Sequence, residues 1–359
     1  MKIKHGGNIY EIAKKHSKNI DEIIDFSANI NPLGISKKLR EAIIENIDII
    51  TKYPDPDYKE LIKAIADYNF IDREYIIPAN GATEIIFLMI EAIRPKKALL
   101  LAPTFLEYER ALKKVGSKVI YFKLEEDKDF KVEPLSFINK ITDDINLIIL
   151  CNPNNPTGQI IEKENLIKIL KKCKEENIYL MIDEAFIEFV DEEKLSMVNY
   201  VEKFHNLLIV KALTKFFAIP GLRLGYGIIS NKILKEKIDL IAQPWTINSF
   251  ASLAGKILLE DKDYIYKSKV LIKEERKYLL KSLNEFKEIK IFNSRANYIF
   301  FKLLREEINL REKLIEKNIL IRQCDNYINL DKCYYRVAVK DRNSNKKLIK
   351  ALREVLYEG

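Results

Sequence analysis

Residues 211–226 read KALTKFFAIPGLRLGY and join an apolar segment at 207–211 to a second one at 225–229. Lys215 lies here among apolar and small residues, with Arg223 eight positions further on. An ammonium group that loses its hydration has a lowered pKa, so its amine becomes nucleophilic. The stretch therefore predicts either a lysine that condenses with an aldehyde or an ordinary surface lysine between a strand and a turn.

Outward from this stretch, short apolar runs alternate with helical patterns. The predicted strands are 98–102, 119–123, 145–150, 179–183, 207–211 and 225–229, and helices are predicted at 84–93, 106–115 and 163–176. Near-continuous apolar runs are typical of strands covered on both faces. We therefore expect an α/β fold whose large domain has a mostly parallel sheet flanked by helices, with ligands at the carboxyl ends of its strands.

Beyond residue 243 the pattern predicts a smaller α+β domain. A helical stretch at 249–286 precedes predicted strands at 290–292, 298–302, 320–322 and 334–339 and helices at 309–317 and 345–357. Near the amino terminus, turn-rich segments at 25–34 and 51–58 surround a short helical pattern at 36–50. We expect an N-terminal arm at 1–43 that packs with the small domain and the active site, a large domain at 44–246 and a small C-terminal domain at 247–359.

Composition excludes several function classes. The net charge of +8 comes from Lys and Glu mixed along the chain, without a basic block interleaved with aromatics, so we expect no nucleic-acid partner. No run approaches the roughly 20 apolar residues of a membrane helix, and we expect no membrane partner. The four cysteines form no CxxC pair and the three histidines have no metal-ligand spacing, which predicts free cysteines, no metal site and a cytoplasmic location.

Two loops at predicted strand or helix ends are candidates for ligand binding. The segment NGATE at 80–84 precedes an apolar helix, where free N–H groups form a phosphate cradle or where Asn80 or Thr83 simply caps the helix. The segment NPNNPTG at 152–158 follows an apolar strand and predicts a rigid loop, either a structural turn or a ligand contact.

Four single residues carry further chemistry. Asp183 ends an apolar strand and needs a cationic or hydrogen-bonding partner, for which a protonated ring nitrogen or a structural ion pair would serve. Tyr108 follows another strand and is either a stacking ring or a core aromatic. Arg322 and Arg336 lie in apolar strands, which predicts an anion site or internal salt bridges. Taken together, these features fit pyridoxal phosphate with an amino-acid substrate.

The order of these motifs resembles the fold-type I pyridoxal-phosphate enzymes of the aminotransferase superfamily over essentially the whole chain. The resemblance implies that Lys215 forms the Schiff base, Asp183 pairs with the ring nitrogen, Asn155 bonds the ring hydroxyl and Tyr108 stacks on the ring. It also implies a homodimer and a substrate carboxylate bound by Arg336. The residues implied to hold the cofactor phosphate are Ala82, Thr83, Thr214 and Arg223, with Tyr53 from the partner subunit.

Two branches of this superfamily share the elements YPD, NNPTG and LRLGY, namely histidinol-phosphate aminotransferases and threonine-phosphate decarboxylases of cobalamin biosynthesis. The chain is similar to the second branch end to end. The shared elements are HGGN at 5–8, DFSANINPLG at 25–34, DEAF at 183–186, Pro244-Trp245 with Asn248, ANY at 296–298 and YYRVA at 334–338. The resemblance implies a lyase that acts on a phosphorylated amino acid, and a transferase stays as the alternative.

Two positions depart from the general aminotransferase pattern. Phe186 stands where many aminotransferases have a tyrosine that also bonds the ring oxygen, and this fits the decarboxylase branch. Ala212 stands where the family usually offers a serine to the cofactor phosphate, so one phosphate contact is missing. A hydrogen bond to a charged group contributes about 1.5–3 kcal/mol.

The expected reaction releases CO2 from L-threonine O-3-phosphate and gives (R)-1-amino-2-propanol O-2-phosphate, a part of the cobalamin nucleotide loop. L-serine O-phosphate, which would give ethanolamine phosphate, stays open because one methyl group provides only about 1–3 kcal/mol of discrimination. By resemblance, we expect the substrate phosphate to be bound by His5, Asn29 and Arg322, with Asn31 behind them. The sequence leaves open a second role for Arg322, in which it helps Arg336 to bind the carboxylate. A cofactor-free interaction protein of the same fold is a third, remote alternative.

Overall fold

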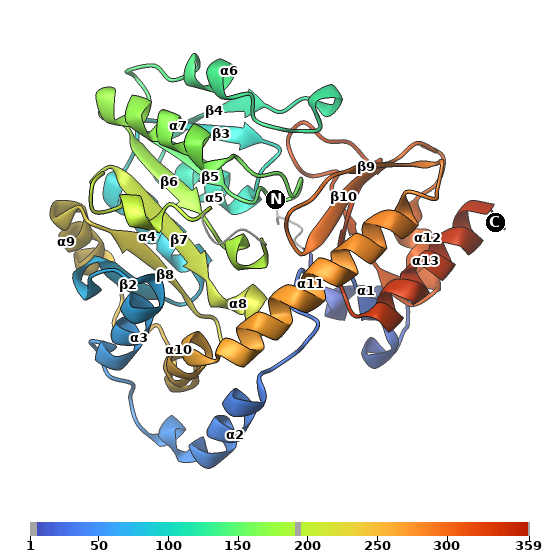
Figure 1. The fold of residues 1–359 in the computed structure, drawn as a ribbon, viewed down its shortest axis with the longest axis horizontal. Helices are drawn as coiled ribbons and strands as arrows, with labels where there is room; N and C mark the ends of the chain where they lie inside the picture. Colours follow the sequence, from blue (N-terminus) through green and yellow to red (C-terminus); the bar gives the residue numbers. More distant parts are fainter. Residues whose placement is uncertain (1–5, 191–194, 358–359) are drawn as a thin grey trace.

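The computed structural model describes residues 6–190 and 195–357. Its centre is a seven-stranded sheet of order β2-β8-β7-β6-β5-β3-β4 (Figure 1). These strands are β2 (Ile76–Ala79), β3 (Lys97–Ala102), β4 (Lys118–Lys123), β5 (Leu147–Cys151), β6 (Tyr179–Asp183), β7 (Leu207–Ala212) and β8 (Gly225–Ile229). Only β8 runs against its neighbours in this sheet. The predicted mostly parallel sheet is therefore confirmed, and β2 is an additional strand that the sequence pattern did not predict.

Helices cover both faces of this sheet, which explains the unbroken apolar runs. The helices around it are α3 (Lys59–Asn69), α4 (Ala82–Ile93), α5 (Leu106–Lys114), α6 (Pro134–Ile138), α7 (Lys163–Glu175), α8 (Leu213–Phe216), α9 (Lys232–Ile241) and α10 (Ser249–Glu260). Alternate residues of one strand enter different cores, because Leu100 belongs to the apolar cluster that includes residues of α4, α5 and α9, whereas Leu99 and Leu101 belong to the cluster that includes residues of α3 and α7. A strand buried on both faces carries apolar residues at every position.

The carboxyl-terminal lobe contains a four-stranded antiparallel sheet of order β12-β13-β10-β9. Its elements are α11 (Lys262–Leu283), β9 (Ile289–Phe292), β10 (Tyr298–Leu303), α12 (Leu310–Glu316), β12 (Arg322–Gln323), β13 (Tyr334–Ala338) and α13 (Arg342–Tyr357). The long helix α11 runs from the large unit to this lobe in Figure 1. The smaller α+β lobe is therefore confirmed.

The amino-terminal residues pack against the small lobe rather than the large sheet. Strand β1 (Ile24–Asp25) pairs in parallel with β11 (Ile319–Leu320), and α1 (Ile9–Lys15) shares an apolar cluster with Ile315 and Leu320. The helix α2 (Lys37–Glu45) then leads into the large unit. The domain boundaries after residues 43 and 246 stay predictions.

Two predicted elements of the carboxyl-terminal half are each divided in the structure. The helical stretch at 249–286 is broken at Asp261, whose carboxylate accepts a hydrogen bond from the Ser36 hydroxyl at 2.6 Å and caps α11. The strand at 320–322 is divided at Ile321, because β11 pairs with β1 whereas β12 joins the four-stranded sheet. Both breaks depend on tertiary contacts, because the partners come from the first 40 residues or from β13.

The segment that follows β4 joins the two lobes. Phe130 belongs to this segment and is 1% exposed, because it is inserted among aromatic rings of the small lobe. These rings, at centroid distances of 5.0, 5.5 and 5.8 Å, are Phe292, Phe300 and Tyr334. In the same segment, Glu126 accepts hydrogen bonds at 2.9 Å from both Lys290 and Lys302. Across the described part of the chain, no helix is long and apolar enough to cross a membrane.

Candidate active site

A cavity of about 720 Å³ lies at the carboxyl ends of the parallel strands, between the large sheet and the small lobe. This volume is within the range of about 300–1,000 Å³ that is usual for small-molecule sites. Its wall is formed by segments from both lobes and from the amino-terminal arm. The lining residues include Gly6, Asp25, Ser27, Asn29, Ala82, Thr83, Phe105, Asn155, Asp183, Phe186, Ala212, Thr214, Lys215, Arg223 and Arg336.

Lys215 lies on the short helix α8, which begins directly after β7, and its side chain faces the cavity. Burial lowers the pKa of its ammonium from the usual 10.5 to about 8, and the positive charges of Arg336 and Arg223 act in the same direction. The carboxylate of Asp25 opposes this effect. A substantial fraction of the neutral amine is therefore present near neutral pH, as a lysine nucleophile requires.

Asp183 ends β6 and faces the same cavity, where its carboxylate is held by two donors. Its Oδ1 accepts from the Ala185 N–H at 2.9 Å and its Oδ2 accepts from the Tyr108 hydroxyl at 2.6 Å. Burial raises the pKa of Asp183 to about 6, although both hydrogen bonds act to lower it. Such a buried carboxylate is stabilised further by a cationic partner, which a protonated ring nitrogen would provide.

The predicted stacking role of Tyr108 is wrong in this structure. Its ring is fully buried with the apolar residues between α4 and α5, and only its hydroxyl reaches Asp183. The aromatic ring on the cavity wall belongs to Phe105, which caps the amino terminus of α5 and lies edge-on to Tyr108 at 5.4 Å. The strand pattern located this segment, but it did not distinguish which of two aromatics three residues apart faces the cavity.

The start of α4 shares the cavity wall with Lys215 and has groups that could hold an anion. Ala82 and Thr83 open this helix, and no side chain caps their N–H groups. A Cβ at Gly81 would lie 2.6 Å from Nη2 of Arg223, so the guanidinium packs directly on this glycine. Thr214 adds a hydroxyl to the same wall, whereas Ala212 contributes none, as its sequence predicts. Free N–H groups at a helix start beside an arginine fit a phosphate group.

Arg336 brings a buried positive charge from β13 to the opposite wall. Its Nη1 donates to Oδ1 of Asn155 and its Nη2 donates to the Ser27 carbonyl at 2.7 Å. The guanidinium lies over the Tyr298 ring at 5.3 Å, and its Nε has no hydrogen-bond partner among the described residues. A buried arginine with a donor left over is suited to bind a carboxylate.

Arg322 is the register partner of Arg336 in the neighbouring strand β12, but it is not part of the cavity wall. Its Nη2 donates to Asn326 Oδ1 at 2.5 Å, and the guanidinium lies over the Tyr327 ring at 5.4 Å. Its predicted contact with the substrate phosphate stays a prediction.

The remaining predicted site residues do not all reach the cavity. Asn29 lines the cavity, and its buried Oδ1 has no hydrogen-bond partner among the described residues. The structure corrects the substrate-binding role predicted for Asn31. Its amide donates at 2.7 Å to both the Phe216 carbonyl and the Ser268 hydroxyl and so supports α8 from behind. Tyr53 is 81% exposed and lies outside the cavity wall. His5 lies outside the described residues.

Sequence reasoning did not predict several charged or polar residues of the wall. These are Asp25, Ser27, Glu107, Arg110 and Tyr327. Asp25 and Ser27 lie within the quoted DFSANINPLG motif, so the motif located them without assigning a role. The others follow from helix and turn geometry that a single sequence does not provide.

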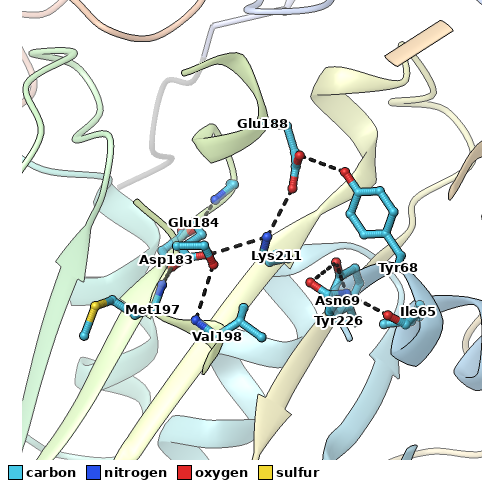
Figure 2. A network of polar contacts seen from close by, with 12 residues as sticks. Ile65, Tyr68, Asn69, Asp183, Glu184, Glu188, Met197, Val198, Lys211 and Tyr226 are labelled. Atoms are coloured by element: carbon cyan, nitrogen blue, oxygen red, sulfur yellow. Dashed lines mark hydrogen bonds and ion pairs between the residues drawn. The ribbon is translucent and has the colours of Figure 1, made fainter. Parts of the chain in front are cut away.

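An ionic cluster of Lys211, Glu184 and Glu188 lies near the ends of β6 and β7 (Figure 2). Lys211 and Glu184 directly adjoin Ala212 and Asp183, which line the cavity. The Lys211 ammonium is 3.1 Å from Glu188 and 3.5 Å from Glu184. Burial opposes the charge on Lys211, but the carboxylates, Glu188 foremost, outweigh it and raise the Lys211 pKa. The cluster therefore links the strand ends that carry Asp183 and Lys215.

The cavity fits pyridoxal phosphate, the cofactor that the resemblance implies. Four features surround this one cavity. They are the Lys215 amine with its lowered pKa, the buried Asp183 carboxylate, the Phe105 ring and the free N–H groups at the start of α4. Each matches one chemical group of this cofactor, namely its aldehyde, ring nitrogen, ring face and phosphate.

Comparison with known proteins gives a consistent family. The family model for class I and II aminotransferases matches residues 21–352. A protein of Caldanaerobacter subterraneus subsp. tengcongensis, provisionally named a threonine-phosphate decarboxylase, is 44% identical over 99% of this chain and 95% of its own length. The threonine-phosphate decarboxylase of Salmonella typhimurium is 37% identical over 98% of this chain and 96% of its own. The crystal structure of the histidinol-phosphate aminotransferase from Clostridium acetobutylicum has a TM-score of 0.87 at 40% identity and covers 92% of this chain and 98% of that one.

Proposed function

Because the chain belongs to the class I and II aminotransferase family, we propose that it is a pyridoxal-phosphate-dependent threonine-phosphate decarboxylase. The reaction converts L-threonine O-3-phosphate to (R)-1-amino-2-propanol O-2-phosphate and CO2, for the nucleotide loop of cobalamin. The observation that carries this proposal is the near full-length identity, 44% and 37%, to two proteins named for that activity. L-serine O-phosphate is a second substrate of the same chemistry.

The residues of the cavity divide the work of such a reaction. When bound, pyridoxal phosphate supplies an electron sink for the pair of electrons left at the substrate α-carbon. Lys215 would hold the cofactor through its amine and would be available to return a proton to that carbon. Asp183 would keep a proton at the ring nitrogen, and Phe105 would supply an aromatic face. Ala82, Thr83, Thr214 and Arg223 would hold the cofactor phosphate, and Asn155 would serve the ring hydroxyl.

The position of the substrate carboxylate decides the reaction type. Only the α-carbon bond that lies perpendicular to the ring is broken readily, so a decarboxylase has to direct the carboxylate there. Arg336 is the buried cation available for this anchoring. Phe186 lies on the same wall and packs edge-on to Tyr298 at 5.1 Å, so it contributes an apolar surface without a hydroxyl. Phe186 fits the decarboxylase branch, whereas a carboxylate-binding arginine is expected in both branches.

Histidinol-phosphate aminotransferase is the second candidate, and the 40% identity to the Clostridium acetobutylicum structure favours it. One experiment separates the two. The purified protein with pyridoxal phosphate is incubated with L-threonine O-phosphate and no keto acid, and CO2 and the amine phosphate are measured. Release of both supports the lyase. Turnover of histidinol phosphate that requires 2-oxoglutarate, without CO2 from threonine phosphate, would replace it by the transferase.

The lowered pKa of Lys215 gives a direct test of its role. The rate at which cofactor-free protein takes up pyridoxal phosphate covalently is expected to rise with pH and to reach half its maximum near pH 8, because only the neutral amine attacks the aldehyde. Stopped-flow absorbance measures this rate. Arg336→Met removes a positive charge that lowers the pKa, so its midpoint should lie at higher pH. A wild-type midpoint near 10.5 would contradict the assignment.

We further propose a homodimer in which Tyr53 of each protomer reaches the cavity of its partner. The Tyr53 ring lies 4.9 Å from that of Trp245, and exposed apolar side chains of Ile44, Ile47 and Ile50 belong to the same part of the chain. Exposed apolar surface of this kind is usually covered by a partner. Sedimentation should give a dimer, and Tyr53→Ala should weaken cofactor binding about tenfold while Tyr10→Ala, at an equally exposed tyrosine, should not. A monomer at micromolar concentration would exclude this arrangement.

The four cysteines are free and buried, which supports the proposed cytoplasmic location because such compartments keep thiols reduced. Cell fractionation with an antibody to the protein tests this, and recovery with the membrane or secreted fraction would contradict it.

A further inference from the structure

We propose that Ser27 couples the amino-terminal arm to Arg336, so that Gly6, Ser27 and Asp25 act as positioning residues for the arginine that binds the substrate carboxylate. This inference rests on the proposed function for the identity of the ligand. It assigns a role to arm and motif residues that do not themselves have to touch the substrate.

Ser27 is the point where three segments of the chain meet. Its hydroxyl accepts a hydrogen bond from the Gly7 N–H at 2.8 Å, and its carbonyl accepts one from Nη2 of Arg336 at 2.7 Å. Ser27 is 4% exposed, so neither bond is easily replaced by solvent. Because both bonds involve one residue, a displacement of the arm at Gly7 displaces the acceptor that orients Arg336.

Asp25 fixes the direction of the Ser27 hydroxyl. Its Oδ1 accepts from the Ser27 backbone N–H at 2.7 Å and from the Ser27 hydroxyl at 2.6 Å. Since the hydroxyl proton points to Asp25, the oxygen lone pairs remain for the Gly7 N–H. The parallel pairing of Asp25 with Leu320 holds this carboxylate on the small lobe that also carries Arg336.

The close approach of the arm requires glycine at position 6. A Cβ there would lie 2.3 Å from the Ser27 carbonyl oxygen and 3.4 Å from Nη2 of Arg336. The first distance is far below van der Waals contact, and the atom it meets is backbone that cannot rotate away. Any side chain at this position therefore pushes the arm away from Ser27 or shifts the acceptor of the guanidinium.

Arg336 responds to such a shift because its remaining bonds are few. Nη1 is held by Asn155 and Nη2 by Ser27, while Nε has no partner among the described residues. Loss of the Ser27 contact leaves the fork held by the Asn155 hydrogen bond and the Tyr298 ring, so its plane is less well fixed. A bidentate carboxylate contact depends on the plane of the guanidinium, so ligands that carry a carboxylate lose affinity and ligands without one do not.

The test compares two ligands in two alanine variants. Gly6→Ala is compared with Gly221→Ala, where a Cβ meets nothing within 4 Å and the backbone is not in the left-handed region. Dissociation constants of L-threonine O-phosphate and of 1-amino-2-propanol phosphate are measured in the holoenzyme by stopped flow, from the change in cofactor absorbance on mixing and before decarboxylation proceeds. Gly6→Ala should weaken the amino acid on the order of tenfold or more, as for loss of a charge-assisted hydrogen bond, and the amine phosphate less than about twofold. Gly221→Ala should change neither.

The conservative variants sharpen the outcome. Asp25→Asn keeps an acceptor for Ser27 and should retain most of the binding of the amino acid, whereas Asp25→Ala should reproduce the ligand-specific loss. Equal weakening of both ligands by Gly6→Ala would mean that the arm only covers the cavity and would overturn the coupling. An unchanged ratio of the two dissociation constants would overturn it as well.

A second measurement does not depend on the substrate. Arg336 lowers the Lys215 pKa, so a changed position of its guanidinium should move the pH midpoint of cofactor uptake in Gly6→Ala and leave it unchanged in Gly221→Ala. If the wild-type protein binds neither phosphate ligand, the proposed function fails while this midpoint still decides the inference. An unmoved midpoint in that case would overturn the coupling.

Discussion

Lys215→Ala is expected to lower decarboxylation of threonine phosphate by about 10⁴-fold or more, because one side chain supplies both the attachment of the cofactor and the nearest proton for the α-carbon. Mass spectrometry after borohydride reduction should find the cofactor attached at residue 215 in the wild type and no attached cofactor in the variant. Lys215 lines the cavity together with Asp183, and its pKa is lowered to about 8.

The matched control is Lys232→Ala, at an exposed lysine whose ammonium lies 3.6 Å from Glu74 on the surface. This variant should keep both turnover and attachment, since exposed ion pairs contribute at most about 1 kcal/mol. Attachment that persists in Lys215→Ala would sink the assignment and direct attention to another lysine.

Lys211→Met is expected to cause the largest loss of stability, about 3–5 kcal/mol in the free energy of unfolding. The substitution keeps the apolar volume but leaves the buried carboxylate of Glu184 and the partly buried one of Glu188, whose side chain is 18% exposed, without this cation. The Tyr68 hydroxyl, which donates to Glu188 at 2.8 Å, does not neutralise a charge. Urea unfolding of each variant at one fixed cofactor concentration measures the change.

The pH dependence of this loss has a defined sign. Burial works to raise the Glu188 pKa, but Lys211 and Tyr68 outweigh it and keep the pKa lowered, so this group stabilises the fold above its unfolded pKa and loses that effect in acid. Lys211 has a raised pKa, so its contribution is fully present below 10.5. The deficit of Lys211→Met should therefore be largest between about pH 5 and 10 and should shrink as Glu188 becomes protonated.

Two further variants test the cause. Lys211→Met combined with Glu188→Gln removes one of the stranded charges and should recover part of the loss. Lys97→Met breaks a surface pair with Asp144, which is 58% exposed, and should cost no more than about 1 kcal/mol. A loss of similar size in Lys97→Met and Lys211→Met would refute the view that the buried cluster is a special support.

The apolar runs predicted the large sheet well, because a strand covered on both faces has no polar position to obscure the pattern. The strand β2 was missed because it has four residues and contains Pro78 at the edge of the sheet. The reversed direction of β8 follows from its pairing with β7 and β2, and pairing is not encoded in the period of one segment.

Motif order located most of the site, but it did not assign each side chain to a face. Phe105 and Tyr108 are separated by almost one helical turn, and only the packing of α5 decides which of them reaches the cavity. Asn31 belongs to the same motif as Asn29, yet its amide is used by the carbonyl of Phe216 and the hydroxyl of Ser268. Tertiary contacts decide the orientation of these side chains, and the partners of Asn31 lie 185 and 237 residues away in the chain.

The insertion of Phe130 between the lobes bears on how the enzyme exchanges its ligands. A rotation of the small lobe as a rigid body would withdraw this ring from its aromatic neighbours and expose it, at about 1.5–3 kcal/mol for the burial alone. The pairs of Glu126 with Lys290 and Lys302 would have to separate in the same movement. Opening of the lobes would thus cost free energy. We therefore expect ligand exchange to leave the two lobes in contact through Phe130 and Glu126.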